Sequence, residues 1–228
     1  MNLLAQVKGT PDRTPGRWVP REVVSSCRPL FAQLHSELPL GSPLVLGISS
    51  PRRGTGRSTV ALGLAAAAAA QLGTGRRVLL IDCDLEHPTL HTLCGVAPKT
   101  GLLEVLRGEV SVADAILPVM PGVSLLPTCE AVPDAVWQLK HMEESQFFVT
   151  LSSYFDAVII DLPPVQTPSL GTLPPLLVPQ LCLVARAAVT RRNDVKNALA
   201  SFPPGQVTAV LLNEQRQRVP RWVDRYLS

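Results

Sequence analysis

The sequence predicts an α/β protein with a doubly wound, mostly parallel sheet and helices on both faces. Short apolar runs of strand length alternate with helical spacers of ten or more residues, which is typical of parallel strands that are buried on both sides. A glycine-containing loop follows the first of these runs and leads into an alanine-rich helix. Together these observations favour an open sheet that binds its ligand at the carboxyl ends of the strands.

Each element follows from this alternation in chain order. Strands are expected at 44–48, 78–82, 123–126, 157–161, 180–185 and 207–212, and helices at 21–38, 57–72, 101–107, 134–152 and 191–201. The first helix carries Pro29, which fits an early helical turn better than the middle of a helix. We therefore expect that helix to begin near Cys27.

The chain has 228 residues, of which 46% are hydrophobic, and this is enough for one large domain with a sizeable core. Residues 1–20 contain Pro11, Pro15 and Pro20 among several charges and are expected to form a flexible arm. The domain itself is expected to span 21–214, and 215–228 would be a short C-terminal tail.

Charge and cysteine content exclude several classes of protein. The formal net charge is +3 and the 21 Lys and Arg residues are scattered, so nucleic acid is not an expected partner. The five cysteines form no CxxC pair, which indicates neither a zinc site nor a disulfide framework and favours a reducing, cytoplasmic location. The longest apolar run, Val60 to Ala70, is too short to span a bilayer, and we expect no signal peptide.

The loop Ser49-Ser50-Pro51-Arg52-Arg53-Gly54-Thr55-Gly56-Arg57-Ser58-Thr59 has the pattern of a phosphate-binding P-loop. Gly54 and Gly56 can adopt backbone angles closed to other residues, and successive N–H groups would face phosphate oxygens. Ser58 would be the hydroxyl on the magnesium side. The loop departs from the strict pattern twice: Pro51 replaces the first glycine, and Arg57 puts a planar, bulkier guanidinium where a lysine is expected.

Acidic residues end two of the predicted strands. Asp82 and Asp84 follow the run 78–81, and Asp161 follows 157–160 in a Walker B pattern with prolines after it. Strand-end aspartates often cap turns, but two such sites in order behind a glycine loop favour a magnesium site.

At these motifs the chain resembles the bacterial tyrosine kinases (BY-kinases, CpsD/CapB-like), within the MinD/ParA class of P-loop ATPases. The resemblance is carried by the loop, by Leu80-Ile81-Asp82-Cys83-Asp84-Leu85-Glu86-His87-Pro88 (Walker A′) and by Ile159-Ile160-Asp161-Leu162-Pro163-Pro164 (Walker B). Weaker similarity lies in 101–108, 184–192 and 211–213, and the whole covers 22 to about 214. In this family a proline commonly precedes the loop glycine, so Pro51 is a smaller departure than the general pattern suggests.

The resemblance implies ATP and Mg²⁺ as cofactors and assigns the site residues. Phosphate contacts would come from Gly54, Thr55, Gly56, Arg57, Ser58 and Thr59, adenine contact from Asn213, metal ligation from Ser58, Asp82 and Asp161, and catalysis from Arg57, Asp82 and Asp84. Asp84 would be the base that accepts a tyrosine proton. These groups suffice in kind, because phosphoryl transfer depends mainly on positioning and charge neutralisation.

Several departures from the family pattern bear on activity. Glu86 stands where the family commonly has an arginine, which makes the local field less favourable for ATP. The C-terminus offers only Tyr226 in place of a tyrosine cluster, and only Arg28 remains of the charged repeat that the family uses to build a ring. Homo-oligomer formation is left open.

Three functions remain. The first is a cytoplasmic tyrosine kinase or ATPase that works beside a membrane-embedded polysaccharide co-polymerase, at the inner face of the membrane, in exopolysaccharide or capsule polymerisation and export. The second is a catalytically degenerate nucleotide-binding regulator or scaffold. A MinD/ParA-type positioning ATPase is the third, disfavoured because 213–228 shows no amphipathic helix of the needed length. Arg52 and Arg53 either reach the phosphates or are simply solvated.

Overall fold

The computed structural model describes residues 19–132, 135–144, 146–166 and 177–214. Seven strands form one sheet in the order β3-β4-β2-β5-β1-β6-β7, parallel throughout except for the antiparallel pair β3 and β4. The strands are β1 (Leu44–Ser49), β2 (Val78–Asp82), β3 (Leu117–Met120), β4 (Val123–Leu126), β5 (Ala157–Asp161), β6 (Gln180–Arg186) and β7 (Val207–Asn213). The predicted fold class is confirmed.

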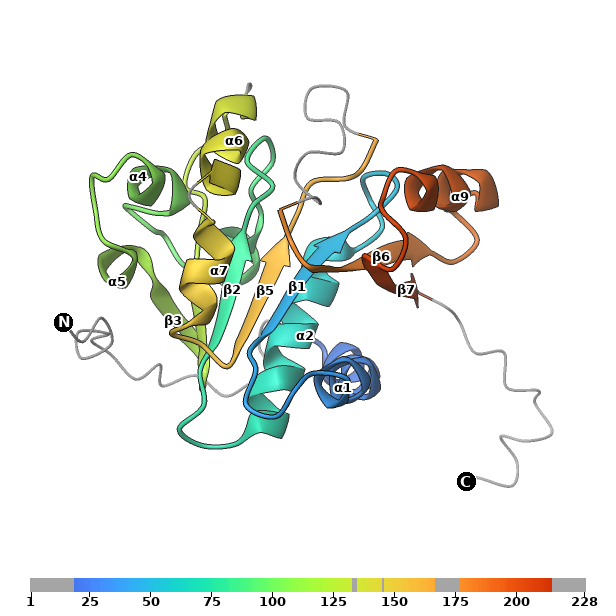
Figure 1. Ribbon diagram of the computed structural model, residues 1–228, viewed down its shortest axis with the longest axis horizontal. Helices are drawn as coiled ribbons and strands as arrows, with labels where there is room; N and C mark the ends of the chain where they lie inside the picture. Colours follow the sequence, from blue (N-terminus) through green and yellow to red (C-terminus); the bar gives the residue numbers. More distant parts are fainter. Residues whose placement is uncertain (1–18, 133–134, 145, 167–176, 215–228) are drawn as a thin grey trace.

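Helices cover both faces of the sheet (Figure 1). Alternate residues of each central strand face opposite cores: Leu80 belongs to one cluster and its neighbour Leu79 to the other. One cluster packs α1 (Arg21–Ser36), α2 (Arg57–Leu72) and α3 (Leu90–Leu93). The other packs α4 (Leu102–Leu106), α5 (Val112–Ala115), α6 (Val136–Glu144), α7 (Phe147–Ser152) and α9 (Arg192–Ala200).

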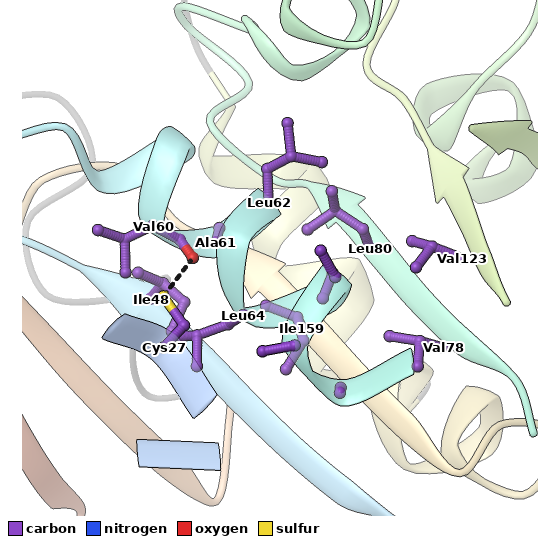
Figure 2. Packing of buried hydrophobic residues seen from close by; sticks show 14 of the residues in the cluster. Cys27, Ile48, Val60, Ala61, Leu62, Leu64, Val78, Leu80, Val123 and Ile159 are labelled. Atoms are coloured by element: carbon purple, nitrogen blue, oxygen red, sulfur yellow. Dashed lines mark hydrogen bonds between the residues drawn. The ribbon is translucent and has the colours of Figure 1, made fainter. Parts of the chain in front are cut away.

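Helix α2, which begins in the glycine loop, lies buried between the sheet and α1. Figure 2 shows Leu80 and Ile159 of the sheet packed with α2, and the Cys27 thiol of α1 donating to the Val60 carbonyl oxygen at 3.9 Å. A Cβ atom at Gly63 would stand 2.7 Å from Cγ1 of Val23, so glycine lets the two helices approach closely. The alanine run of α2 therefore serves packing, as expected from its composition.

The helix expected at 21–38 is confirmed with its start at residue 21, and the later start near Cys27 that Pro29 suggested is wrong. Helix α1 begins at Arg21 and contains Pro29 in its interior. Proline removes one backbone hydrogen bond, but the helix buries Cys27, Phe31 and Leu34 against the core, and this packing offsets the loss. The expected arm and tail lie outside the described residues apart from Val19 and Pro20, and Val19 is buried in the core. Tyr226 also lies outside them.

Other differences concern short elements. The helix expected at 134–152 is two helices, α6 and α7, with Gln146 at φ +48° before the second. Strand β3 and the one-turn helices α3 and α5 were not predicted. In the described part of the chain, no helix has both the length and the apolar character that a membrane span requires.

Strand register brings the predicted site residues together. The carboxyl ends of β1, β5 and β2 lie at one edge of the sheet (Figure 1). In that edge row Asp161 pairs with Asp82 on one side and with Ile48 on the other, just before the loop begins. The fold thus places both acidic strand ends beside the glycine loop.

We expect replacement of Phe31 by alanine to lower the free energy of unfolding by about 3 to 5 kcal/mol, because the ring is fully buried between α1 and the core. Urea unfolding followed by circular dichroism measures this. Leu40→Ala is the matched control: its side chain is fully exposed, so the change should stay within about 0.5 kcal/mol. Equal, small effects of the two substitutions would show that α1 is not an integral part of the domain.

Candidate functional site

The loop between β1 and α2 has the backbone geometry that its glycines predict. Gly54 has φ +79° and Gly56 has φ +80°, angles that favour glycine. At Gly56 a side chain would also collide with the Asn213 amide. Helix α2 starts directly after Gly56, so its first N–H groups face the space beside the loop. A pocket of about 310 Å³ opens there. It is lined by Ser50, Arg53, Gly54, Thr55, Gly56, Arg57, Ser58, Thr59, Asp84, His87, Thr89 and Leu93.

Arg57, in the lysine position, is held by two carboxylates. Its Nε donates to Oδ1 of Asp161 and its Nη2 donates to Oδ2 of Asp84, both at 2.6 Å. The side chain is only 9% exposed, and both aspartates are almost fully buried. Burial alone would lower the pKa of the Arg57 guanidinium, but the charges of Asp161 and Asp84 outweigh it and raise that pKa. Arg57 is therefore a fixed cation at the junction of β2, β5 and α2.

Asp82, unlike Asp84 and Asp161, forms no ion pair with a cation among the described residues. Its Oδ2 accepts hydrogen bonds from the backbone N–H groups of Thr89 and Leu90, at 2.9 and 2.8 Å. Burial and the neighbouring charge of Asp161 raise the pKa of Asp82 well above its usual range. Burial also raises the pKa of Asp161, with Arg57 and the Ser58 hydroxyl acting in the opposite direction.

Two oxygens of this cluster suit a magnesium ion. Oδ1 of Asp82 and Oδ2 of Asp161 are buried without a hydrogen-bond partner in the described residues. The Ser58 hydroxyl lies near Asp161, since it acts to lower the pKa of that carboxyl, and hard oxygen donors of this kind are the ligands that Mg²⁺ prefers. No group of three or more His, Cys, Asp or Glu residues that could hold a metal occurs in the described ranges. The protein ligands would therefore be few, with phosphate and water oxygens completing the shell.

Asp84 lines the pocket but is tied to arginines. Its Oδ2 accepts from Arg57 and, at 3.2 Å, from Nη1 of Arg53. Arg53 also pairs with Glu86 at 3.4 Å. The residue expected to act as a base thus stands between two guanidinium groups, and one of its carboxylate oxygens already accepts a hydrogen bond from each of them.

Contacts from the far edge of the sheet hold the loop in place. At the end of β7, Nδ2 of Asn213 donates to the Thr55 carbonyl at 2.9 Å. Arg186, at the end of β6, donates to the Gly54 carbonyl at 3.4 Å. Arg52 pairs with Asp194 of α9 at 3.1 Å, but its side chain is 62% exposed, so this pair adds little to the position of the loop. The adenine contact of Asn213 stays a prediction, while its present contact fixes the loop.

All residues predicted for the phosphate and metal sites lie together at this loop. The sequence did not predict that His87, Thr89 and Leu93 line the pocket. They do so because the segment 87–93 approaches the start of α2, where Thr89 Oγ1 lies 3.2 Å from Ser58 Oγ. A glycine loop, a following helix and strand-end carboxylates at one edge of a parallel sheet define the class of P-loop nucleoside triphosphatases.

Comparison with known proteins agrees with this class and finds sequence relatives among the tyrosine-protein kinases. No family model matches the chain. The chain is 28% identical over 204 residues to the tyrosine-protein kinase wzc of Salmonella typhi, covering 88% of this chain. It is 25% identical over 184 residues to the tyrosine-protein kinase CpsD of Streptococcus agalactiae, covering 79% of each. The chain is thus a homologue of bacterial tyrosine kinases, as its motifs predict. It spans only about 28% of the length of wzc.

Solved structures show the same fold. The chimerical protein CapA2B2 matches with a TM-score of 0.73 at 23% identity, covering 84% of this chain and 85% of that one. The kinase domain of the Escherichia coli tyrosine kinase ETK has a TM-score of 0.73 at 22% identity, over 92% and 87%. MinD of Aquifex aeolicus, in a complex with MinC, is less similar, with a TM-score of 0.58 at 22% identity over 74% and 67%.

A further neighbour was solved with a nucleotide analogue. Cobyrinic acid a,c-diamide synthase from Mycobacterium smegmatis, with bound ATP analogue and magnesium, has a TM-score of 0.56 at 24% identity, covering 74% of this chain and 72% of that one. One protein with this fold is thus known with an ATP analogue and magnesium bound.

We expect Arg57→Gln to lower the free energy of unfolding by about 3 to 5 kcal/mol, because it leaves the buried Asp161 without its cation and Asp84 with only the longer contact to Arg53. Chemical unfolding at pH 7 measures the loss. Arg76→Gln is the matched control, since Arg76 pairs with Asp156 at the same 2.6 Å but is 60% exposed, and its loss should be below about 1 kcal/mol. A loss at Arg57 no larger than at Arg76 would contradict the fixed-cation role.

We expect Asp82 to make the domain less stable as the pH rises. Because its folded-state pKa lies above the usual 3.8, its contribution is fully present below that value and is lost as the pH rises through the folded-state pKa. In Asp82→Asn this part of the decline should disappear, since an amide oxygen can still accept from Thr89 and Leu90. Unfolding titrations of both proteins between pH 4 and 8, with a metal chelator present, compare the slopes. Identical slopes would contradict the assignment.

Proposed function

We propose that this chain is an ATP-binding domain of the bacterial tyrosine kinase type, which transfers the γ-phosphoryl group of ATP to a tyrosine hydroxyl. The observation that supports this most is the convergence of Asp82, Asp84 and Asp161 on a positive-φ glycine loop beside a pocket of about 310 Å³. The names of its homologues support the same reaction.

In this proposal the chain's own residues mainly position and neutralise charge. Loop N–H groups from Gly54 to Thr59 hold the phosphate oxygens, and the start of α2 adds positive potential. Ser58, Asp82 and Asp161 hold Mg²⁺, which when bound neutralises the phosphate charge. Asp84 accepts the proton of the attacking hydroxyl through Oδ1, which neither arginine contacts and which accepts a 3.3 Å hydrogen bond from the His87 N–H. Asn213 contacts the adenine side.

The biological setting is proposed from the family resemblance. The domain would act in exopolysaccharide or capsule polymerisation and export, with a membrane-embedded co-polymerase as its activating partner at the inner face of the membrane.

A second candidate is a regulator that binds nucleotide without turning it over. The ion pairs of Arg57 favour it, because they occupy one oxygen each of Asp84 and Asp161. Turnover would require Asp84 to accept a proton while it is paired with two arginines, and Arg57 to act on phosphate while it is bound to two carboxylates. Nucleotide would then act only by changing contacts with the partner.

We expect the purified protein with Mg-ATP to show turnover and phosphotyrosine, and Asp161→Ala to lower the rate by at least about 100-fold through loss of charge stabilisation. Phosphate release and anti-phosphotyrosine blotting measure this, with the partner's cytosolic segment added in parallel. Asp114→Asn, on exposed α5, is the control that should retain full rate. ATP binding without turnover under both conditions would reject the kinase and leave the regulator.

A further inference from the structure

Within the described residues two arginines line the phosphate pocket, and they are held very differently. Arg57 makes two 2.6 Å bonds to buried carboxylates and is 9% exposed. Arg53 makes longer contacts, 3.2 Å to Asp84 and 3.4 Å to Glu86, and is 41% exposed. Asp84 keeps its 2.6 Å bond to Arg57 if Arg53 leaves, and the Arg53 side chain is already partly solvated, whereas removing Arg57 would leave Asp161 as an uncompensated buried charge. Arg53 can therefore change partners at low cost and Arg57 cannot.

We propose that Arg53 is the side chain that contacts the nucleotide phosphates, while Arg57 stays on Asp84 and Asp161 as a fixed counter-ion. This inference rests on the proposed nucleotide binding. It assigns the contact with the phosphates to Arg53 in the loop, in place of Arg57 at the start of α2. Arg53 directly precedes Gly54, so its guanidinium stands at the mouth of the same pocket that the loop N–H groups face.

The charges around Arg53 fit this role. A planar guanidinium binds phosphate oxygens in a bidentate way, and a phosphate chain carries more negative charge than the two single carboxylates that now hold Arg53. Arg53 also pairs with Glu86 at 3.4 Å, so a cation already lies beside this carboxylate at the edge of the pocket. Arg53 can thus pair with Glu86 in the absence of an anion and contact phosphate oxygens when an anion is bound.

The neighbouring Arg52 does not fit the role of a phosphate contact. Arg52 contacts Asp194 of α9 through two nitrogens, at 3.1 and 3.2 Å, and does not line the pocket. Two adjacent arginines of the same loop, one in the pocket and one outside, form a natural matched pair.

The test compares the affinities of ATP and ADP for the whole chain by isothermal titration calorimetry, with magnesium and with a chelator. We expect Arg53→Gln to weaken binding about 10-fold or more, as loss of a charge-assisted hydrogen bond does, with a melting temperature close to that of the unsubstituted protein. Arg52→Gln should bind within about twofold of the unsubstituted protein. AMP, with one phosphate, should be affected less than ATP.

Three results would overturn the assignment. Arg53→Gln could bind ATP as the unsubstituted chain does, or Arg52→Gln could lose as much affinity, which would indicate a general charge effect. Arg57→Gln, measured at a temperature where it remains folded, could lose more affinity than Arg53→Gln, which would return the phosphate contact to Arg57. Failure of the unsubstituted chain to bind any nucleotide is a separate result and would overturn the proposed function itself.

Discussion

The buried ion pairs of Arg57 are the interaction on which this end of the molecule depends. One guanidinium joins the helix that starts in the loop to the ends of two neighbouring strands, through Asp84 after β2 and Asp161 at the end of β5. Without it, several carboxylates would stand close together in a region from which water is largely excluded, where like charges repel strongly. The arginine thus allows the acidic cluster to be buried at all, before any ligand is considered.

This has a cost for chemistry. A lysine at the same place would be a compact, mobile charge on a flexible stem, while an arginine presents a rigid fork that two carboxylates satisfy well. Because the two carboxylates already accept hydrogen bonds from the guanidinium, fewer of its N–H groups are available to a phosphate. The site therefore combines an intact loop backbone with a cation committed elsewhere, and this is why binding and turnover are separate questions for this chain.

Much of the fold could be predicted from the sequence, because central parallel strands are continuous apolar runs and their ends carry recognisable residues. The strands ending at Asp82 and Asp161 and the loop between β1 and α2 were placed within a residue. Strand β3 was missed because it is short and contains Pro118, which an edge strand tolerates and a central strand does not. The start of α1 was wrong because burial against α2 outweighs the proline's local preference. The direction of the Arg57 side chain could not be predicted, since sequence gives its charge but not which of several nearby anions it meets.

The hydrogen bond from Asn213 to the Thr55 carbonyl joins residues 158 positions apart. During synthesis on the ribosome the loop emerges early, but the strand that secures it is the last one of the described domain to appear. Closing so long a stretch of chain is slow compared with forming a helix, so the loop reaches its final shape late. A newly made chain would consequently complete the pocket beside the loop only when the last strand has joined the sheet.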